Sequence, residues 1–140
     1  MNSTVTGLNV VCFIPLIMQL LILAMAIEES EPKDFFAMKR SNRTFVGFFF
    51  APWCGHCKAF KPHVEAAQLK LTDEVPILAF DCTKDSNHNL CSQMGVNGYP
   101  TIKIFNHNGK RKAALDYQGE RTEEPFIQWI REHKRADKDL

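Results

Sequence analysis

An apolar, aromatic-rich run followed at once by two cysteines constrains the fold of this chain more than any other feature. The run, TFVGFFFA, has the length and composition of a β-strand that is buried on both faces. After the cysteines, CKAFKPHVEAAQLKL contains helix formers and apolar residues at helical spacing, and Pro62 within it predicts a kink. Cys54 and Cys57 therefore stand where a buried strand passes into a helix, and we expect Cys54 at the helix N-terminus.

The remaining segments predict further alternation of strands and helices. VPILAFDC predicts a second buried strand, and DSNHNLCSQM predicts a short helix capped by Asp85 or Ser86. TIKIF and AALDYQG predict a hairpin around the turn NHNG, and Thr122 is expected to cap a closing helix. With a short helix around residues 34–39 before the first strand, the predicted order from that strand onward is β-α-β-α-β-β-α.

The first 26 residues are predicted to be a signal peptide. Residues 10–27 are almost wholly apolar, and Ala24-Met25-Ala26 fits a small-x-small cleavage site. The alternative is an uncleaved membrane anchor, because the apolar core is long for a signal peptide and near the lower limit for a spanning helix. Either segment would direct the chain to the secretory pathway, where disulfides form. The formal net charge of +1 gives no reason to expect a nucleic-acid partner.

Three kinds of site compete for Cys54 and Cys57. A structural zinc site needs about four ligands, but Cys82 and Cys91 are too far apart in the sequence to form a second ligand pair and have no histidine at ligand spacing. A permanent disulfide between residues three apart would close a very short loop and add little stability. A reversible redox couple is therefore favoured, and neither a metal nor an organic cofactor is expected.

The physics of the helix start assigns roles to the two cysteines. Free amides and the positive end of the helix dipole favour a thiolate at Cys54, and His56 has the same effect when it is protonated. The Cys54 thiolate would attack a disulfide, and Cys57, one turn along, would resolve the mixed disulfide.

Four segments of the chain resemble one protein family in collinear order. FFAPWCGHCK, FDCTKD, GVNGYPT and YQGERTEEPFIQWI are similar to the catalytic domains of the protein disulfide isomerase family. The resemblance implies an α/β thioredoxin fold, with a central mixed β-sheet flanked by helices, over residues 27–132. It also implies thiol–disulfide exchange on cysteine-containing client proteins, with glutathione or an upstream thiol oxidase as redox partner. The alternative is a redox-responsive chaperone or adaptor that binds clients with little isomerase turnover.

The resemblance also implies roles for individual residues. Pro100 matches a cis-proline that packs against the active disulfide and, with Tyr99, presents backbone to an extended substrate. Arg121 matches an arginine that lowers the pKa of the inner cysteine. Cys82 and Cys91 match a structural disulfide of some relatives. For Trp53, contact with substrate and packing against the fold remain equally open.

Two positions depart from the family pattern. The family usually carries a buried glutamate six residues before the first cysteine and a lysine partner on the next strand, whereas this chain has Phe48 and Ala79. Replacing both members of a buried ion pair by apolar groups can be neutral for stability. Cys57 would lose an internal base, so slower resolution of the mixed disulfide is expected. The segment before the first buried strand is also short, and the family's first edge strand is expected to be missing or drawn from the leader.

The C-terminal residues predict a cellular compartment, and one sequon predicts glycosylation. Residues 133–140 are expected to be a flexible tail, and its final DKDL is similar to the retrieval tetrapeptide of the endoplasmic reticulum in its acidic and leucine character. We expect the endoplasmic reticulum lumen, with secretion or anchoring by the N-terminal segment as alternatives. Asn42-Arg43-Thr44 predicts N-glycosylation at Asn42.

Overall fold

The elements follow one another in alternation along the chain. The computed structural model of the protein describes residues 18, 26–109 and 113–134. From the first strand onward the order is the predicted β-α-β-α-β-β-α. The elements are α2 (Pro32–Ser41), β1 (Phe45–Phe50), α3 (Gly55–Lys70), β2 (Ile77–Asp81), α4 (Asp85–Gln93), β3 (Thr101–Phe105), the 3-10 helix η1 (His107–Gly109), β4 (Ala114–Asp116) and α5 (Glu123–His133).

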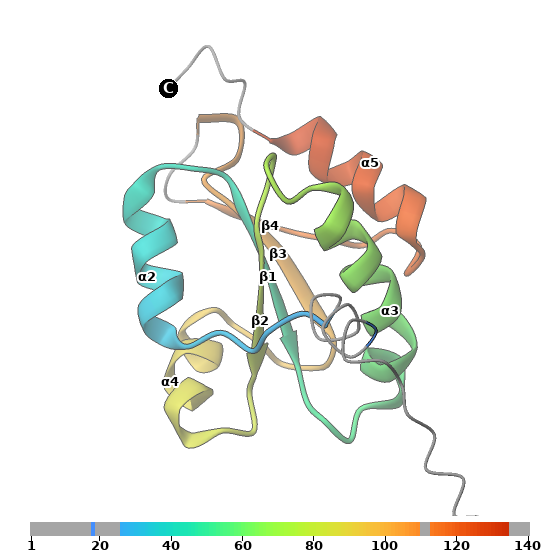
Figure 1. The fold of residues 1–140 in the computed structure, drawn as a ribbon. Helices are drawn as coiled ribbons and strands as arrows, with labels where there is room; N and C mark the ends of the chain where they lie inside the picture. Colours follow the sequence, from blue (N-terminus) through green and yellow to red (C-terminus); the bar gives the residue numbers. More distant parts are fainter. Residues whose placement is uncertain (1–17, 19–25, 110–112, 135–140) are drawn as a thin grey trace, which may run out of the picture.

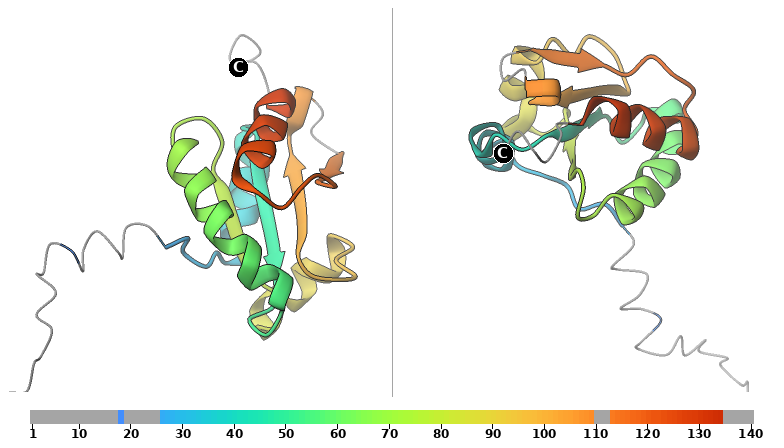
Figure 2. Two further views of the ribbon diagram at one scale, coloured as in Figure 1. Left: turned by 90° about the vertical axis from the view of Figure 1, so that its right-hand side faces the viewer. Right: turned by 90° about the horizontal axis from the view of Figure 1, so that it is seen from above.

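The strands form one mixed sheet in the order β2-β1-β3-β4. β1 pairs in parallel with β2 and antiparallel with β3, and β4 completes a hairpin with β3. Helices α3 and α5 cover one face of the sheet, and α2 and α4 cover the other (Figure 1 and Figure 2). The predicted arrangement of a central mixed sheet flanked by helices is confirmed.

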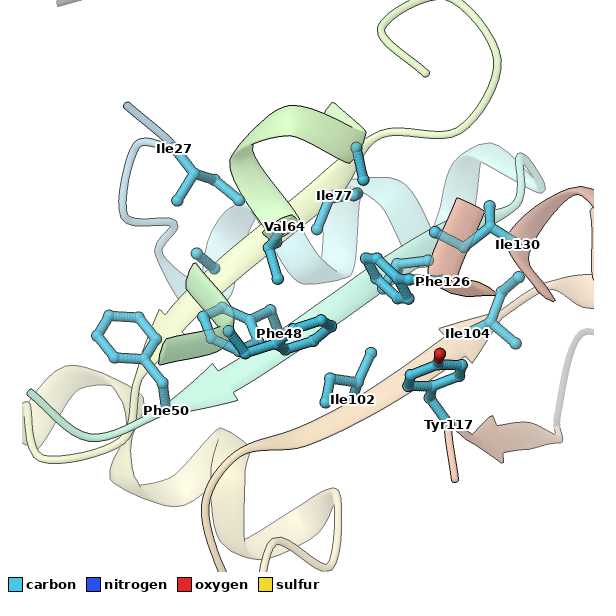
Figure 3. Close-up of a cluster of buried hydrophobic side chains, with 14 of the residues drawn as sticks. Ile27, Phe48, Phe50, Val64, Ile77, Ile102, Ile104, Tyr117, Phe126 and Ile130 are labelled. Carbon is cyan, nitrogen blue, oxygen red and sulfur yellow. The ribbon is translucent and has the colours of Figure 1, made fainter. Parts of the chain in front are cut away.

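The central strand β1 is buried along its whole length. Val46, Phe48 and Phe50 belong to the cluster under α3 and α5, part of which Figure 3 shows. Phe45 and Phe49 belong to the second cluster, under α2 and α4. A strand with helices on both sides needs apolar residues at every position, and this explains why the run appears continuous in the sequence.

Within the described residues, the N-terminal segment pairs with the sheet through one isolated bridge. Glu29 forms an isolated parallel bridge with Ala79 on the outer edge of β2, and the Ser30 N–H donates to the Ala79 carbonyl at 2.7 Å. Ile27 is buried in the α3 side of the core, and its N–H donates to Glu65 Oε1 at 3.4 Å. Where the family is expected to have an edge strand, the described part of this chain therefore has one bridge.

Predictions for the two chain ends and for the starts of two helices can be compared with the structure. The predicted signal peptide lies outside the described residues except for Met18 and Ala26, and residues 135–140 of the predicted tail lie outside them as well. Across residues 26–109 and 113–134, no helix is long and apolar enough to cross a membrane. The predicted cap of α4 was wrong, because Lys84 is its N-cap residue. Thr122 occupies the N-cap position of α5 as predicted, although its side chain makes no capping hydrogen bond.

Candidate redox site

The two cysteines lie at the start of α3, directly after the central strand. Cys54 is the N-cap residue of α3, with extended backbone (φ −76°, ψ 115°), and its N–H donates to the Ala51 carbonyl at 3.1 Å. The Cys57 N–H donates to Cys54 Sγ at 3.2 Å. Both cysteines are free thiols. The sulfur of Cys54 thus occupies the position in which a capping side chain accepts from an otherwise unpaired helix amide.

The thiol of Cys57 is held in its protonated form. Only 3% of Cys57 is exposed, and this burial is the main reason why its pKa is raised to about 12. The hydrogen bond with Cys54 also raises the pKa, while a backbone hydrogen bond at Ala51 and the charge of Arg121 lower it. Burial disfavours the charged form of an acid, so at neutral pH Cys57 must lose a proton before it can attack a disulfide.

The other residues predicted for the site differ in their exposure. His56 is exposed in the first turn of α3, and Arg121 is exposed before α5. The Tyr99–Pro100 peptide bond is cis, and Pro100 is buried. Trp53 is 70% exposed, and its ring meets that of Tyr99 edge-on, with 5.8 Å between the ring centroids. The loop before α3 and the loop before β3 therefore meet beside Cys54 through these two rings.

Cys82 and Cys91 form a disulfide that joins the end of β2 to α4. Their Cα atoms are 5.9 Å apart. The bridge belongs to the cluster under α2 and α4, whereas Cys54 and Cys57 belong to the cluster under α3 and α5. The two cysteine pairs are thus packed into different halves of the core. Among the residues that the structure describes, no group of three or more His, Cys, Asp or Glu side chains could hold a metal ion.

The predicted sequon residue Asn42 ends helix α2. It adopts the left-handed conformation, with φ 62°, and is half-buried. Its Oδ1 atom is shielded from solvent.

Phe48 and Ala79 are register partners on β1 and β2. Phe48 is fully buried and Ala79 is 1% exposed. The Phe48 ring stacks on Phe50, with centroids 5.5 Å apart, and meets Phe60 of α3 edge-on at 6.2 Å. The two positions are filled by mutually packed apolar groups, as expected for a joint replacement of a buried charged pair.

A cavity of about 200 Å³, which no sequence pattern predicted, adjoins Cys57. Apolar side chains from the end of β1 form part of its wall, and charged side chains from the N-terminal segment and α3 form the rest. The lining residues are Glu29, Phe48, Phe50, Ala51, Pro52, Cys57, Lys58 and Lys61. Glu29 was missed by sequence reasoning because a polar residue in a polar segment gives no periodic signal. Its contact with the sheet depends on one bridge.

Sequence comparisons identify the family of this chain. The family model described as Thioredoxin matches residues 27–132. Protein disulfide-isomerase A6 of Homo sapiens is 47% identical over 88 residues, which are 63% of this chain and 19% of that protein. Protein disulfide-isomerase 1 of Dictyostelium discoideum is 35% identical over 109 residues, which are 76% of this chain and 29% of that protein. The chain thus spans less than a third of the length of these relatives.

Solved structures share the fold. The first thioredoxin domain of mouse Protein disulfide-isomerase A4 superposes with a TM-score of 0.62 at 34% identity, covering 77% of this chain and 79% of that domain. The J-Trx1 fragment of ERdj5 superposes with a TM-score of 0.67 at 28% identity, covering 77% of this chain and 51% of the fragment. The chain therefore belongs to the thioredoxin family, and its domain is related to those of the protein disulfide isomerases.

Proposed function

We propose that this protein catalyses thiol–disulfide exchange on cysteines of client proteins in the secretory pathway. The observation that carries the proposal is the position of Cys54 Sγ at the N-cap of α3, where it accepts the Cys57 N–H at 3.2 Å. A sulfur that already accepts a backbone amide at a helix N-terminus is arranged to carry negative charge. Cys57 lies one turn deeper, within reach of the same sulfur.

The exchange proceeds through one covalent intermediate. In the oxidising direction, a client thiolate attacks the Cys54–Cys57 disulfide at Cys54 Sγ, and Cys57 leaves and takes up a proton. A second client thiolate then displaces Cys54, which leaves the client oxidised and the protein's pair reduced. In the reducing direction, the Cys54 thiolate attacks a client disulfide, and Cys57 closes on Cys54 to release the client.

The surrounding residues support these steps in different ways. His56 would stabilise the Cys54 thiolate when protonated, and Arg121 lowers the pKa of Cys57 through its charge. Trp53 and Tyr99 offer an aromatic pair beside Cys54 for apolar client side chains. Pro100, which follows Tyr99 on the same loop, would present backbone to an extended client segment.

The relatives suggest the compartment and the partners. Proteins named protein disulfide isomerases and the structures of ERdj5 fragments share this domain. We propose the endoplasmic reticulum lumen as the location, with glutathione or a thiol oxidase restoring the disulfide. N-glycosylation at Asn42 is proposed on the sequon alone, with its half-buried position against it.

A second candidate is a redox-responsive binding module with little turnover. The exposed ring of Trp53 favours it, because an aromatic surface beside the site binds unfolded chains whether or not sulfur chemistry follows. The enzyme requires Cys54 and Cys57 for its activity, whereas a binding module would not need them to bind clients.

Refolding of a reduced, disulfide-containing client separates the two candidates. If the protein is an enzyme, Cys54→Ser/Cys57→Ser should abolish the acceleration of client oxidation. Cys57→Ala should then accumulate a mixed disulfide between Cys54 and the client. Trp53→Ala should weaken client capture whether the protein is an enzyme or a binding module. Full acceleration by the Cys54→Ser/Cys57→Ser variant would refute the enzyme and support the binding module.

A further inference from the structure

We propose that Glu29, from the N-terminal segment, carries the Cys57 proton between the cavity beside that thiol and solvent when Cys57 resolves a mixed disulfide. The inference rests on the proposed function and adds a proton-transferring residue to it. It begins from a requirement of the chemistry. Cys57 is a buried thiol, and its attack on Cys54 needs a route for the departing proton.

The cavity supplies that route. Cys57 and Glu29 both line it, and among the described residues of its lining Glu29 is the one carboxylate. Its volume of about 200 Å³ is well above the about 10–15 Å³ that one water molecule requires, so water can connect the two side chains. The Glu29 side chain is 42% exposed, so it joins the cavity to solvent.

The sheet register explains why Glu29 faces this cavity. Phe48 pairs with Ala79 on β2, and Ala79 pairs in turn with Glu29. Paired residues on neighbouring strands point to the same face, so all three side chains lie on the face that α3 covers. The middle residue, Ala79, carries only a methyl group, and the side chains on either side of it, Phe48 and Glu29, both line the cavity.

Contacts on both sides fix the position of Glu29. On the chain's C-terminal side of Glu29, the Ser30 N–H donates to the Ala79 carbonyl, and on its N-terminal side Ile27 is buried against the core. Lys84, at the start of α4, forms an ion pair with Glu29 Oε2. The carboxylate is thus held at the sheet edge.

The step balances with these groups alone. The Cys57 S–H bond breaks, and the proton passes through water to Glu29 and on to solvent. Cys57 Sγ forms a bond to Cys54 Sγ, and the bond between Cys54 and the client sulfur breaks. The client sulfur leaves as a thiolate with the electron pair, so the client is reduced and the pair is oxidised. In the opposite direction Glu29 returns the proton to Cys57.

Other charged groups near Cys57 do not replace Glu29 in this role. Lys58 and Lys61 line the cavity and Arg121 acts on Cys57 through its charge, but each is a cation that accepts no proton. Cys54 is bonded to the client in the mixed disulfide, so its sulfur is not a base at this step.

A single-turnover measurement tests the inference. Cys54 is first converted to a mixed disulfide with thionitrobenzoate, and the release of the coloured thiolate then reports attack by Cys57 alone. We expect Glu29→Gln to slow release at pH 7 by about 10–100-fold, at or below the lower end of general acid–base effects. The difference should narrow as the pH rises toward 10, because hydroxide then removes the proton directly. A purely structural role would slow release equally at every pH.

Matched variants complete the design. Glu28→Gln changes the neighbouring exposed carboxylate, which does not line the cavity, and should leave release unchanged. In Glu29→Ala, added formate should restore part of the rate, and Glu29→Asp should retain most of it. If wild type releases the thiolate and Glu29→Gln does so equally fast at pH 7, the inference is overturned while the proposed function stands. If wild type releases none, the proposed function itself fails.

Discussion

At the scale of single residues, Cys54 and Cys57 have different environments although only two residues separate them. Cys54 caps α3 and accepts a backbone amide, whereas Cys57 belongs to the helix itself and is packed against the end of β1. Burial raises the pKa of Cys57 to about 12, so its thiolate is rare at neutral pH. The asymmetry assigns the first attack to Cys54 and makes the second step dependent on proton loss.

This asymmetry predicts the order of alkylation. With iodoacetamide at pH 7, Cys54 of the reduced protein should be modified at least about 100-fold faster than Cys57, because alkylation follows the thiolate fraction and access. Modification of Cys57, followed in Cys54→Ser by mass spectrometry, should still be rising at pH 10. Equal rates at both residues of the native protein would contradict the assigned roles.

The packing of Phe48 and Ala79 predicts a strong coupling between these positions. Phe48→Glu alone should lower the free energy of unfolding by about 3–5 kcal/mol, because it buries an unpaired charge against Phe50 and Phe60. Adding Ala79→Lys should recover part of the loss, with a coupling free energy of about 1–3 kcal/mol, and should speed release of the mixed disulfide. Denaturant unfolding and the thionitrobenzoate assay check both effects. Additive losses in stability with no gain in rate would contradict this account.

At the scale of elements, the Cys82–Cys91 bridge fastens α4 to the end of β2. Few other side-chain bonds join these elements, although Asn87 Nδ2 donates to the Asp81 carbonyl at 3.0 Å. The bridge closes a short loop in the half of the core that does not contain Cys54. Its contribution should therefore be to stability.

Removing the bridge tests this separation. Cys82→Ala/Cys91→Ala should lower the free energy of unfolding by about 2–3 kcal/mol on the chain-entropy account of a loop of this size. Release of thionitrobenzoate from Cys54 should be unchanged below the melting transition. Ser92→Ala, on the exposed side of α4, serves as the control and should leave the free energy of unfolding nearly unchanged. Loss of exchange without loss of stability would show that the bridge takes part in the chemistry.

The loop after α3 holds α5 through one carboxylate. Glu74 accepts from Arg131 at 2.9 Å and from Lys134 at 2.8 Å. The hydrogen bonds from these two cations lower the pKa of Glu74 to about 2. Because the folded pKa lies below the unfolded value, this contribution is present above about pH 4.3 and is lost as the pH falls through about 2.

The ion pairs of Glu74 predict a pH-dependent difference in stability between wild type and a Glu74 variant. Glu74→Gln should lower the free energy of unfolding by about 0.5–1 kcal/mol at pH 7, as is usual for largely exposed ion pairs. The gap to wild type should close by about pH 2. Asp73→Asn, at the exposed neighbouring position, should show a smaller effect at pH 7. A gap that persists unchanged at pH 2 would exclude ion pairing as its cause.

At the scale of the whole molecule, the central strands could be predicted from the sequence better than the ends of the helices. TFVGFFFA was predictable as a strand because all six residues of β1 are buried, so both faces had to be apolar. The cap of α4 was not, because Asp81 Oδ1 accepts from the Thr83 N–H and hydroxyl and organises the turn from the preceding strand. Neither Asp85 nor Ser86, the two predicted caps, therefore occupies the N-cap position.

The residues of the site also differ in how well the sequence predicts their positions. Spacing alone placed Cys54 at a helix start, because a buried strand and an amphipathic segment meet there. The cis peptide before Pro100 came only from the resemblance, since proline bonds in general are mostly trans. The cavity beside Cys57 and the approach of Glu29 depend on contacts between segments far apart in the chain, and no local pattern encodes them.

The reduction potential of the Cys54–Cys57 pair is the most direct test of the account. The protein would be equilibrated in glutathione buffers of graded composition, quenched in acid, alkylated and analysed by mass spectrometry, with Cys82→Ala/Cys91→Ala as a second sample. We predict a reversible two-electron transition between about −270 and −120 mV, the range of thioredoxin-fold oxidoreductases. A pair that stays fully reduced or fully oxidised across all buffers would contradict the claim that these two sulfurs exchange their bond.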